Sequence, residues 1–98
     1  MAIVISDAVL QKLAQKHLVS VVEVQQCFEN RTGGLLTDNR EDHKTDPATL
    51  WFIALTNRNR PLKVCFIPRG EDQNIRTCYS PNDAELRIYR AVAKPTDF

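Results

Sequence analysis

Arginine and tyrosine side chains gather toward the end of the chain. They are Arg69, Arg76, Tyr79, Arg87, Tyr89 and Arg90. Arg76 falls in an expected strand, and Arg87 and Arg90 lie three residues apart in an expected helix, so both elements can direct guanidinium groups to one face. Guanidinium groups bind phosphate oxygens in pairs and stabilise the charge of an attack by a ribose 2′-hydroxyl, while tyrosine stacks on a base. The alternative interpretation is salt bridging on the helix surface, with Glu85 as the partner.

A histidine next to a lysine offers a second chemical group. Lys16 and His17 lie where the first helix is expected to end, and cations are favoured beside the exposed carbonyls of a helix C-terminus. The imidazole of His17 also titrates near neutral pH, which is what proton transfer in catalysis needs. Both interpretations stay open.

The charge of the chain is unevenly distributed. The net charge is only +1, which argues against a basic nucleic-acid coat. Residues 1–56 carry five Lys or Arg against seven acids, whereas residues 57–94 carry eight against four. The second part could guide a polyanion or an acidic protein; the alternative is a solvated strand edge and helix face.

No motif of the chain indicates a metal or a cofactor. The acidic run of residues 38–46 would need a glycine at its sixth position and a closing glutamate to form a calcium loop, and His43 and Thr49 stand there. Gly33 and Gly34 lack the strand and helix that frame a phosphate-binding loop. We expect neither a metal nor a cofactor.

Cysteine use and hydropathy indicate the compartment. Cys27, Cys65 and Cys78 lie in apolar runs without a C-x-x-C spacing, so they read as reduced packing residues and favour the cytoplasm. Residues 1–5 are apolar but lack the cationic flank and long apolar region of a signal peptide, and no stretch approaches the length of a membrane span.

Two helices are expected first. Ser6 or Asp7 can cap a helix that ends near Lys16 or His17, because apolar residues recur there at helical spacing. Ser20 and Glu23 then fit a capping box, in which each side chain accepts a hydrogen bond from the other residue's backbone amide.

Three strands are expected in the second half of the chain. Residues 30–47 read as a mobile loop with at most one short strand, followed by strands at residues 49–56, 61–69 and 75–79. Tight turns, the second of them at residues 70–74, join these strands and make their pairing antiparallel.

A helix closes the chain. Ser80 is expected to cap it, with Pro81 as its first residue, and it runs to about Ala93. With 98 residues, 43% of them hydrophobic, the chain forms a single domain over residues 1–98. The expected class is α+β: two N-terminal helices, an antiparallel three- to four-stranded sheet and one C-terminal helix.

Several motifs, in order, resemble those of BrnT-like toxins. The first is Lys16-His17-Leu18-Val19-Ser20, followed by Val22-Glu23-Val24 and Phe28. The second is Ile75-Arg76, followed by Glu85 and Tyr89. The strands between, Trp51 to Ala54 and Leu62 to Phe66, are also similar. The chain differs where the family's closing strand ends in Ser-Ala-Arg, because Tyr79-Ser80-Pro81-Asn82 stands there and one cation is absent.

The resemblance implies a RelE-like fold and the toxin half of a type II toxin–antitoxin pair, a small ribonuclease neutralised by a DNA-binding antitoxin. The cationic second part of the chain and the resemblance together lead to the hypothesis of an RNA-cleaving toxin. Its catalytic residues would be His17, Arg76, Glu85 and Tyr89, and its RNA contacts Lys16, Arg69, Tyr79, Arg87 and Arg90. In this hypothesis His17 or Glu85 moves a proton. The alternative hypothesis is a non-catalytic protein-binding or regulatory module on the same fold.

Overall fold

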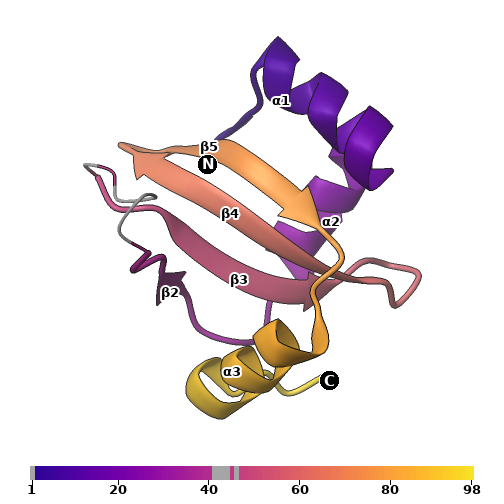
Figure 1. Ribbon diagram of the computed structural model, residues 1–98, viewed down its shortest axis with the longest axis vertical. Coiled ribbons are helices and arrows are strands. Elements are labelled where there is room, and N and C mark those ends of the chain that lie inside the picture. The colour runs from indigo at the N-terminus through magenta and orange to yellow at the C-terminus, as the bar shows by residue number, and fades with distance from the viewer. Residues whose placement is uncertain (1, 41–44, 46) are drawn as a thin grey trace.

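The computed structural model describes residues 2–40, 45 and 47–98. The elements, in chain order, are β1 (Ala2–Val4), α1 (Asp7–Lys12), the π-helical segment η1 (Leu13–His17), α2 (Val21–Asn30), β2 (Leu36–Thr37), β3 (Leu50–Leu55), β4 (Pro61–Arg69), β5 (Asp72–Tyr79) and α3 (Asp83–Ala93). Figure 1 shows the sheet crossing the molecule, with α1 beside β5 and α3 beyond β3. The predicted α+β class is confirmed.

The sheet has five strands in the order β1-β5-β4-β3-β2 and is mixed rather than wholly antiparallel. β1 adds parallel to the edge of β5, with Ala2 opposite Asp72 and Val4 opposite Asn74. We did not predict this strand, because three residues are too few to show an alternating pattern. The predicted turn at residues 70–74 is too long: β5 already begins at Asp72, and the turn consists of Gly70, with a φ of 61°, and Glu71.

The central hairpin agrees with the sequence. β3 and β4 pair antiparallel from Leu50 opposite Phe66 to Leu55 opposite Pro61. Asn59, with a φ of 63°, adopts the left-handed conformation that asparagine tolerates in tight turns.

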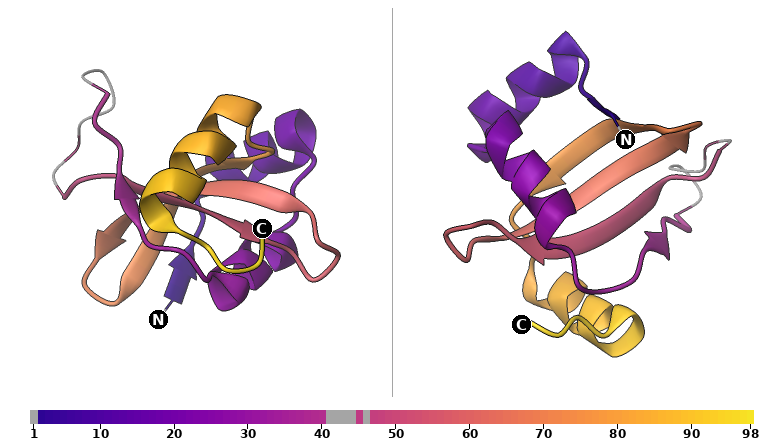
Figure 2. Two further views of the ribbon diagram at one scale, coloured as in Figure 1. Left: turned by 90° about the horizontal axis from the view of Figure 1, so that it is seen from below. Right: turned by 180° about the vertical axis from the view of Figure 1, so that it is seen from behind.

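Helices cover the two faces of the sheet. α2 packs on one face, where the Phe28 ring lies 5.0 Å from the Phe52 ring and 5.3 Å from the Phe66 ring, measured between centroids. On the opposite face α3 brings Tyr89 to 5.7 Å from Trp51. The two views of Figure 2 show α2 and α3 on opposite sides of the strands. Of α3's residues, Tyr89 is the one fully buried in this core.

The helix caps confirm one prediction in full and correct another. Ser20 and Glu23 form the predicted capping box at the start of α2. At α3, however, the cap is Asn82 and not Ser80: Asn82 Oδ1 accepts from the Glu85 N–H at 2.8 Å, and Glu85 Oε1 accepts from the Asn82 N–H at 3.0 Å. The glutamate three residues after Asn82 decides the position, because the box needs both partners.

The glycine pair is fixed against the last helix. The Tyr89 hydroxyl donates to the Gly34 carbonyl at 2.7 Å, and the Gly34 N–H donates to the Ala93 carbonyl at 3.1 Å. These contacts correct the expectation of a mobile loop for this part of residues 30–47. Across the described ranges, none of the helices has the length and apolar content needed to cross a membrane.

The absence of a side chain at Gly33 leaves room for the Tyr89 hydroxyl. A substitution at this position should therefore lower the stability of the fold. A Cβ atom at Gly33 would lie 2.6 Å from that oxygen, whereas one at Gly34 would meet only Ala93, at 3.9 Å. We expect Gly33→Ala to lower the free energy of unfolding by about 1–3 kcal/mol, because Tyr89 is buried and cannot move aside without strain. Urea unfolding, with Gly34→Ala as the matched control, measures the difference; equal stability of the two variants would contradict it.

Candidate functional site

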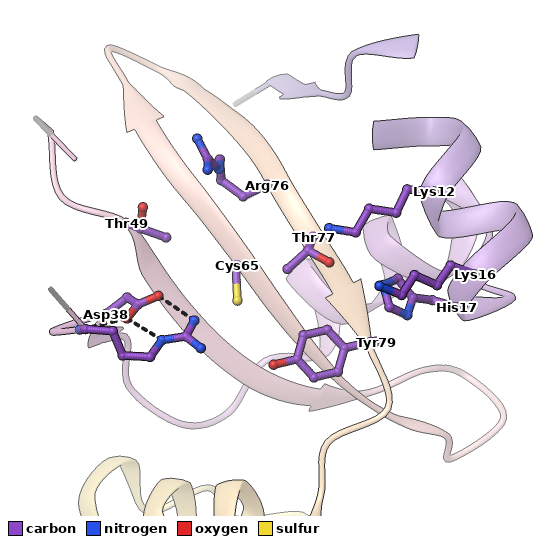
Figure 3. A pocket seen from close by; sticks show the side chains of 10 residues that line it. Lys12, Lys16, His17, Asp38, Thr49, Cys65, Arg76, Thr77 and Tyr79 are labelled. Atoms are coloured by element: carbon purple, nitrogen blue, oxygen red, sulfur yellow. Dashed lines mark hydrogen bonds and ion pairs between the residues drawn. The ribbon is translucent and has the colours of Figure 1, made fainter. Parts of the chain in front are cut away.

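A cavity of about 300 Å³ opens on the face of the sheet that α2 does not cover (Figure 3). We call it the cationic cavity; it is lined by Lys12, Lys16, His17, Asp38, Arg40, Thr49, Cys65, Arg76, Thr77 and Tyr79. Figure 3 shows that lysines and His17 line it from the α1–η1 side, Arg76, Thr77 and Tyr79 from β5, and Asp38 from the far side. Four of its side chains are Lys or Arg, so it favours anions.

A β-bulge in β5 places two consecutive side chains in the cavity. Cys65 lies opposite Thr77, but the next residue, Phe66, lies opposite Ile75, so Arg76 has no counterpart on β4. Regular alternation would send Arg76 and Thr77 to opposite faces. Instead both line the cavity, and Ile75 and Cys78 remain buried (Figure 3).

The π-helical segment η1 supplies the other wall. An α-helix that ends near His17 was predicted, but its last turn is wider, and the Leu18 N–H donates back to the Leu13 carbonyl. A π turn holds more residues than an α turn, so both the fourth and the fifth residue after Lys12 fall on its side of the helix. Lys12, Lys16 and His17 therefore line the cavity together.

Arg60, in the turn of the β3–β4 hairpin, is hydrogen-bonded to the end of η1 and to α2. Its guanidinium donates to the carbonyl of Leu18 at 2.9 Å, to the carbonyl of His17 at 3.3 Å and to Glu23 Oε2 at 3.0 Å. These bonds satisfy carbonyl groups that the end of a helix leaves unpaired. Arg60 therefore positions His17 without lining the cavity.

The imidazole of His17 favours its neutral form. Burial and, after it, the positive charges of Lys12 and Lys16 lower the pKa of His17 below its ordinary value of 6.5. Its ring centroid lies 5.5 Å from that of Tyr79. At neutral pH the cavity thus holds a proton acceptor among cations.

Glu85 lies beside the cavity and holds Tyr79 in place. Glu85 Oε2 accepts from the Tyr79 hydroxyl at 2.8 Å and from Lys63 Nζ at 2.7 Å. Burial by itself opposes the negative charge, but the hydrogen bonds from Lys63, Asn82 and Tyr79 outweigh it and lower the pKa of Glu85. Burial and donation to Glu85 raise the pKa of Tyr79, so its hydroxyl stays protonated.

The other side chains that the sequence singled out lie apart from the cavity. Arg69 lies opposite Asp72 at the far end of the β4–β5 pair. Arg87 and Arg90 line a separate groove along α3. Tyr89 is fully buried, and its hydroxyl bonds to Gly34.

Three cations near the site were missed by sequence reasoning. Lys12 and Arg40 line the cavity, and the ammonium of Lys63 lies 4.5 Å from the centroid of the Trp51 ring. The spacing of Lys12 and Lys16, one helical turn, could have indicated the first. Local sequence gives no comparable signal for Arg40, which follows β2, or for Lys63 in the middle of β4, because the tertiary fold brings both near the site.

Thiols and carboxylates are the other possible metal ligands and nucleophiles of the chain. Cys27, Cys65 and Cys78 are buried and free, as predicted, and burial raises the pKa of Cys65 to about 11, so its thiol stays protonated. No group of three or more His, Cys, Asp or Glu suited to a metal ion occurs within residues 2–40, 45 and 47–98. From the acidic run, Glu41, Asp42, His43 and Asp46 lie outside these residues.

The Lys63–Glu85 ion pair should make the stability of the fold depend on pH. The two side chains are 8% and 17% exposed. Because the folded state lowers the pKa of Glu85, the pair stabilises the fold above the unfolded pKa of about 4.3, and this contribution is lost as the pH falls through the folded value. Glu85→Gln retains a capping side chain but removes the charge.

We expect Glu85→Gln to lower the free energy of unfolding by about 1–3 kcal/mol at pH 7. The difference in this free energy between the variant and wild type should shrink as the pH falls from about 5 toward 3. Denaturant unfolding at several pH values measures it. Glu29→Gln, at an exposed carboxylate of α2, is the control. A gap independent of pH would contradict the role of the charge.

Comparison with protein families and with curated proteins reveals no relative. No protein-family model matches the chain, and no curated protein matches it significantly. A functional assignment must therefore rest on the cationic cavity and on the motif resemblance.

Proposed function

We propose that this chain is a small cytoplasmic RNA endonuclease of the toxin type that works without a metal, with the cationic cavity as its active site. The observation that carries the proposal is the position of the His17 imidazole, which lies 5.5 Å from the Tyr79 ring between centroids and lines the cavity with Lys12, Lys16 and Arg76. The resemblance to BrnT-like toxins with their RelE-like fold supports it. That resemblance also supports an antitoxin as the partner that neutralises the chain.

The proposed reaction cuts the RNA backbone through its own ribose. The 2′-oxygen attacks phosphorus while the bond to the 5′-oxygen breaks, which leaves a 2′,3′-cyclic phosphate and a 5′-hydroxyl. His17 accepts the proton of the 2′-hydroxyl, and the departing 5′-oxygen takes a proton from water. Lys12, Lys16 and Arg76 stabilise the charge on the phosphate oxygens, and Tyr79 stacks on a base.

Glu85 has a positioning role in this proposal. Its lowered pKa and its bonds to Lys63, Asn82 and Tyr79 make proton transfer less suitable for it than for His17. It orients the Tyr79 ring instead. Arg69, at the far end of the β4–β5 pair, takes no part in the proposed reaction. Arg87 and Arg90 would contact RNA only outside the cavity, and Tyr89 serves the core.

Loss of one cavity cation should slow cleavage. We expect Arg76→Ala to lower the rate by roughly 10²-fold, because one donor to the developing phosphate charge is lost. Arg69→Ala, at an arginine outside the cavity on the neighbouring strand, should cut at nearly the wild-type rate. The purified variants are compared on a labelled RNA, with cyclic-phosphate ends as the product. Equal rates for all three proteins would contradict the assignment of the cavity.

The acid limb of the pH–rate profile should belong to His17. The base is active when neutral, so cleavage should fall as the pH drops through a midpoint below 6.5, the ordinary pKa, because burial and two lysines lower it. His17→Gln should lose roughly 10²- to 10⁴-fold in rate and abolish this limb. A limb unchanged in position in this variant would exclude His17 as the base.

Expression in a bacterium tests the function itself. Wild type should arrest growth and degrade total RNA, and His17→Gln should do neither. Normal growth and intact RNA, with folded protein confirmed, would remove the proposal.

A second candidate function is a binding module without catalysis. One observation favours it. Of the two groups proposed for proton transfer, His17 lines the cavity and Glu85 does not, and Glu85 is paired with Lys63. The cavity therefore contains one proposed proton-transfer group and not two. In that case the cavity binds a polyanion or an acidic protein segment. If wild type and His17→Gln are equally inactive on RNA but bind it or a partner equally well, this function stands.

A further inference from the structure

Arg40 differs from the other cations of the cavity because a carboxylate holds it. Its Nε donates to Asp38 Oδ1 at 3.1 Å and its Nη2 donates to Asp38 Oδ2 at 2.9 Å. The Arg40 backbone N–H also donates to Oδ1, at 3.1 Å. The Asp38 side chain is only 7% exposed, whereas that of Arg40 is 57% exposed. A buried carboxylate therefore fixes an exposed guanidinium in one orientation.

This arrangement suits a base edge better than a phosphate. A guanidinium has five N–H groups in a planar fork, and Asp38 takes two of them, so the edge formed by Nη1 and Nη2 can meet another pair of acceptors. The carboxylate also offsets the positive charge, which weakens attraction to phosphate. Lys12, Lys16 and Arg76 supply that attraction elsewhere in the cavity.

The wall opposite Arg40 offers a surface on which a base can stack. Arg40 follows β2 at one edge of the sheet, whereas Tyr79 belongs to β5. The strands β3 and β4 lie between β2 and β5. The Tyr79 hydroxyl is fixed by Glu85 at 2.8 Å, and Figure 3 shows its ring extending from β5 toward the side of Asp38. A base stacked on this ring would extend across the cavity toward the guanidinium.

We propose that Arg40 is a specificity-determining residue that reads the O6 and N7 acceptors of a guanine in single-stranded RNA, and that Asp38 holds it in position. Guanine is the base that offers two adjacent acceptors to the two donors of arginine. Adenine presents an N–H₂ donor beside its N7, and pyrimidines have no N7. The proposal rests on the proposed function only in taking RNA as the ligand.

Binding of short oligonucleotides tests this inference without cleavage. The probe is a fluorescent hexamer of uridines with one central guanine, built with 2′-fluoro sugars so that no 2′-hydroxyl can attack. Matched hexamers carry 7-deazaguanine, which lacks N7, or adenine at the same position. Fluorescence anisotropy gives the dissociation constants for wild type, Arg40→Lys and Asp38→Asn, with Arg69→Lys as the control outside the cavity.

We expect wild type to bind the guanine hexamer about 5- to 100-fold more tightly than the other two. Arg40→Lys keeps the charge but not the fork, so this preference should fall to nearly one while affinity for an all-uridine hexamer is retained. Asp38→Asn should reduce the preference, and Arg69→Lys should keep it. Equal affinity of wild type for all three bases, or an unchanged preference in Arg40→Lys, would overturn the inference.

The outcome is separable from that of the proposed nuclease. Guanine preference with unmodified RNA left intact would support the reading of guanine and remove the nuclease. Cleavage next to every base alike would overturn the reading of guanine and keep the nuclease. No binding to any hexamer would overturn the reading of guanine, while the nuclease is decided by the cleavage and growth experiments.

Discussion

The carboxylate of Glu85 joins three elements of the fold. Oε1 holds the Asn82 N–H that starts α3, while Oε2 accepts from Lys63 on β4 and Tyr79 on β5. Lys63 is almost fully buried, so its charge is tolerable only beside a fixed carboxylate. The start of the last helix, the buried cation and the tyrosine of the cavity wall therefore depend on one side chain.

The same arrangement recurs at the other capping box. Glu23 Oε1 accepts from the Ser20 N–H, and Oε2 accepts from Arg60, which in turn holds the carbonyl groups at the end of η1. In both boxes a glutamate at the third helical position uses one oxygen for the helix and the other for a cation of the sheet or its hairpin. Each cap thus also fixes one wall of the cationic cavity.

Charge along the sequence was a poor guide to charge in space. The sequence indicated residues 57–94 as the cationic part, yet Lys12, Lys16 and Arg40, three of the four Lys or Arg of the cavity, come from the net acidic first part. Two acids of that part are paired with arginines: Glu23 with Arg60 and, within the cavity, Asp38 with Arg40. A count over a segment cannot show which charges are already paired.

Local sequence determined the helices, their caps at Ser6 and Ser20, the β3–β4 hairpin and the α+β class, because caps, turns and apolar spacing act within a few residues. It did not determine β1, whose three residues become a strand only on the edge of β5. Nor did it bring the site together. Arg76 and Tyr79 are an odd number of residues apart, so a regular strand would send them to opposite faces. Only the bulge opposite Cys65 and Phe66, a feature of how β5 pairs with β4, places both in one cavity with His17.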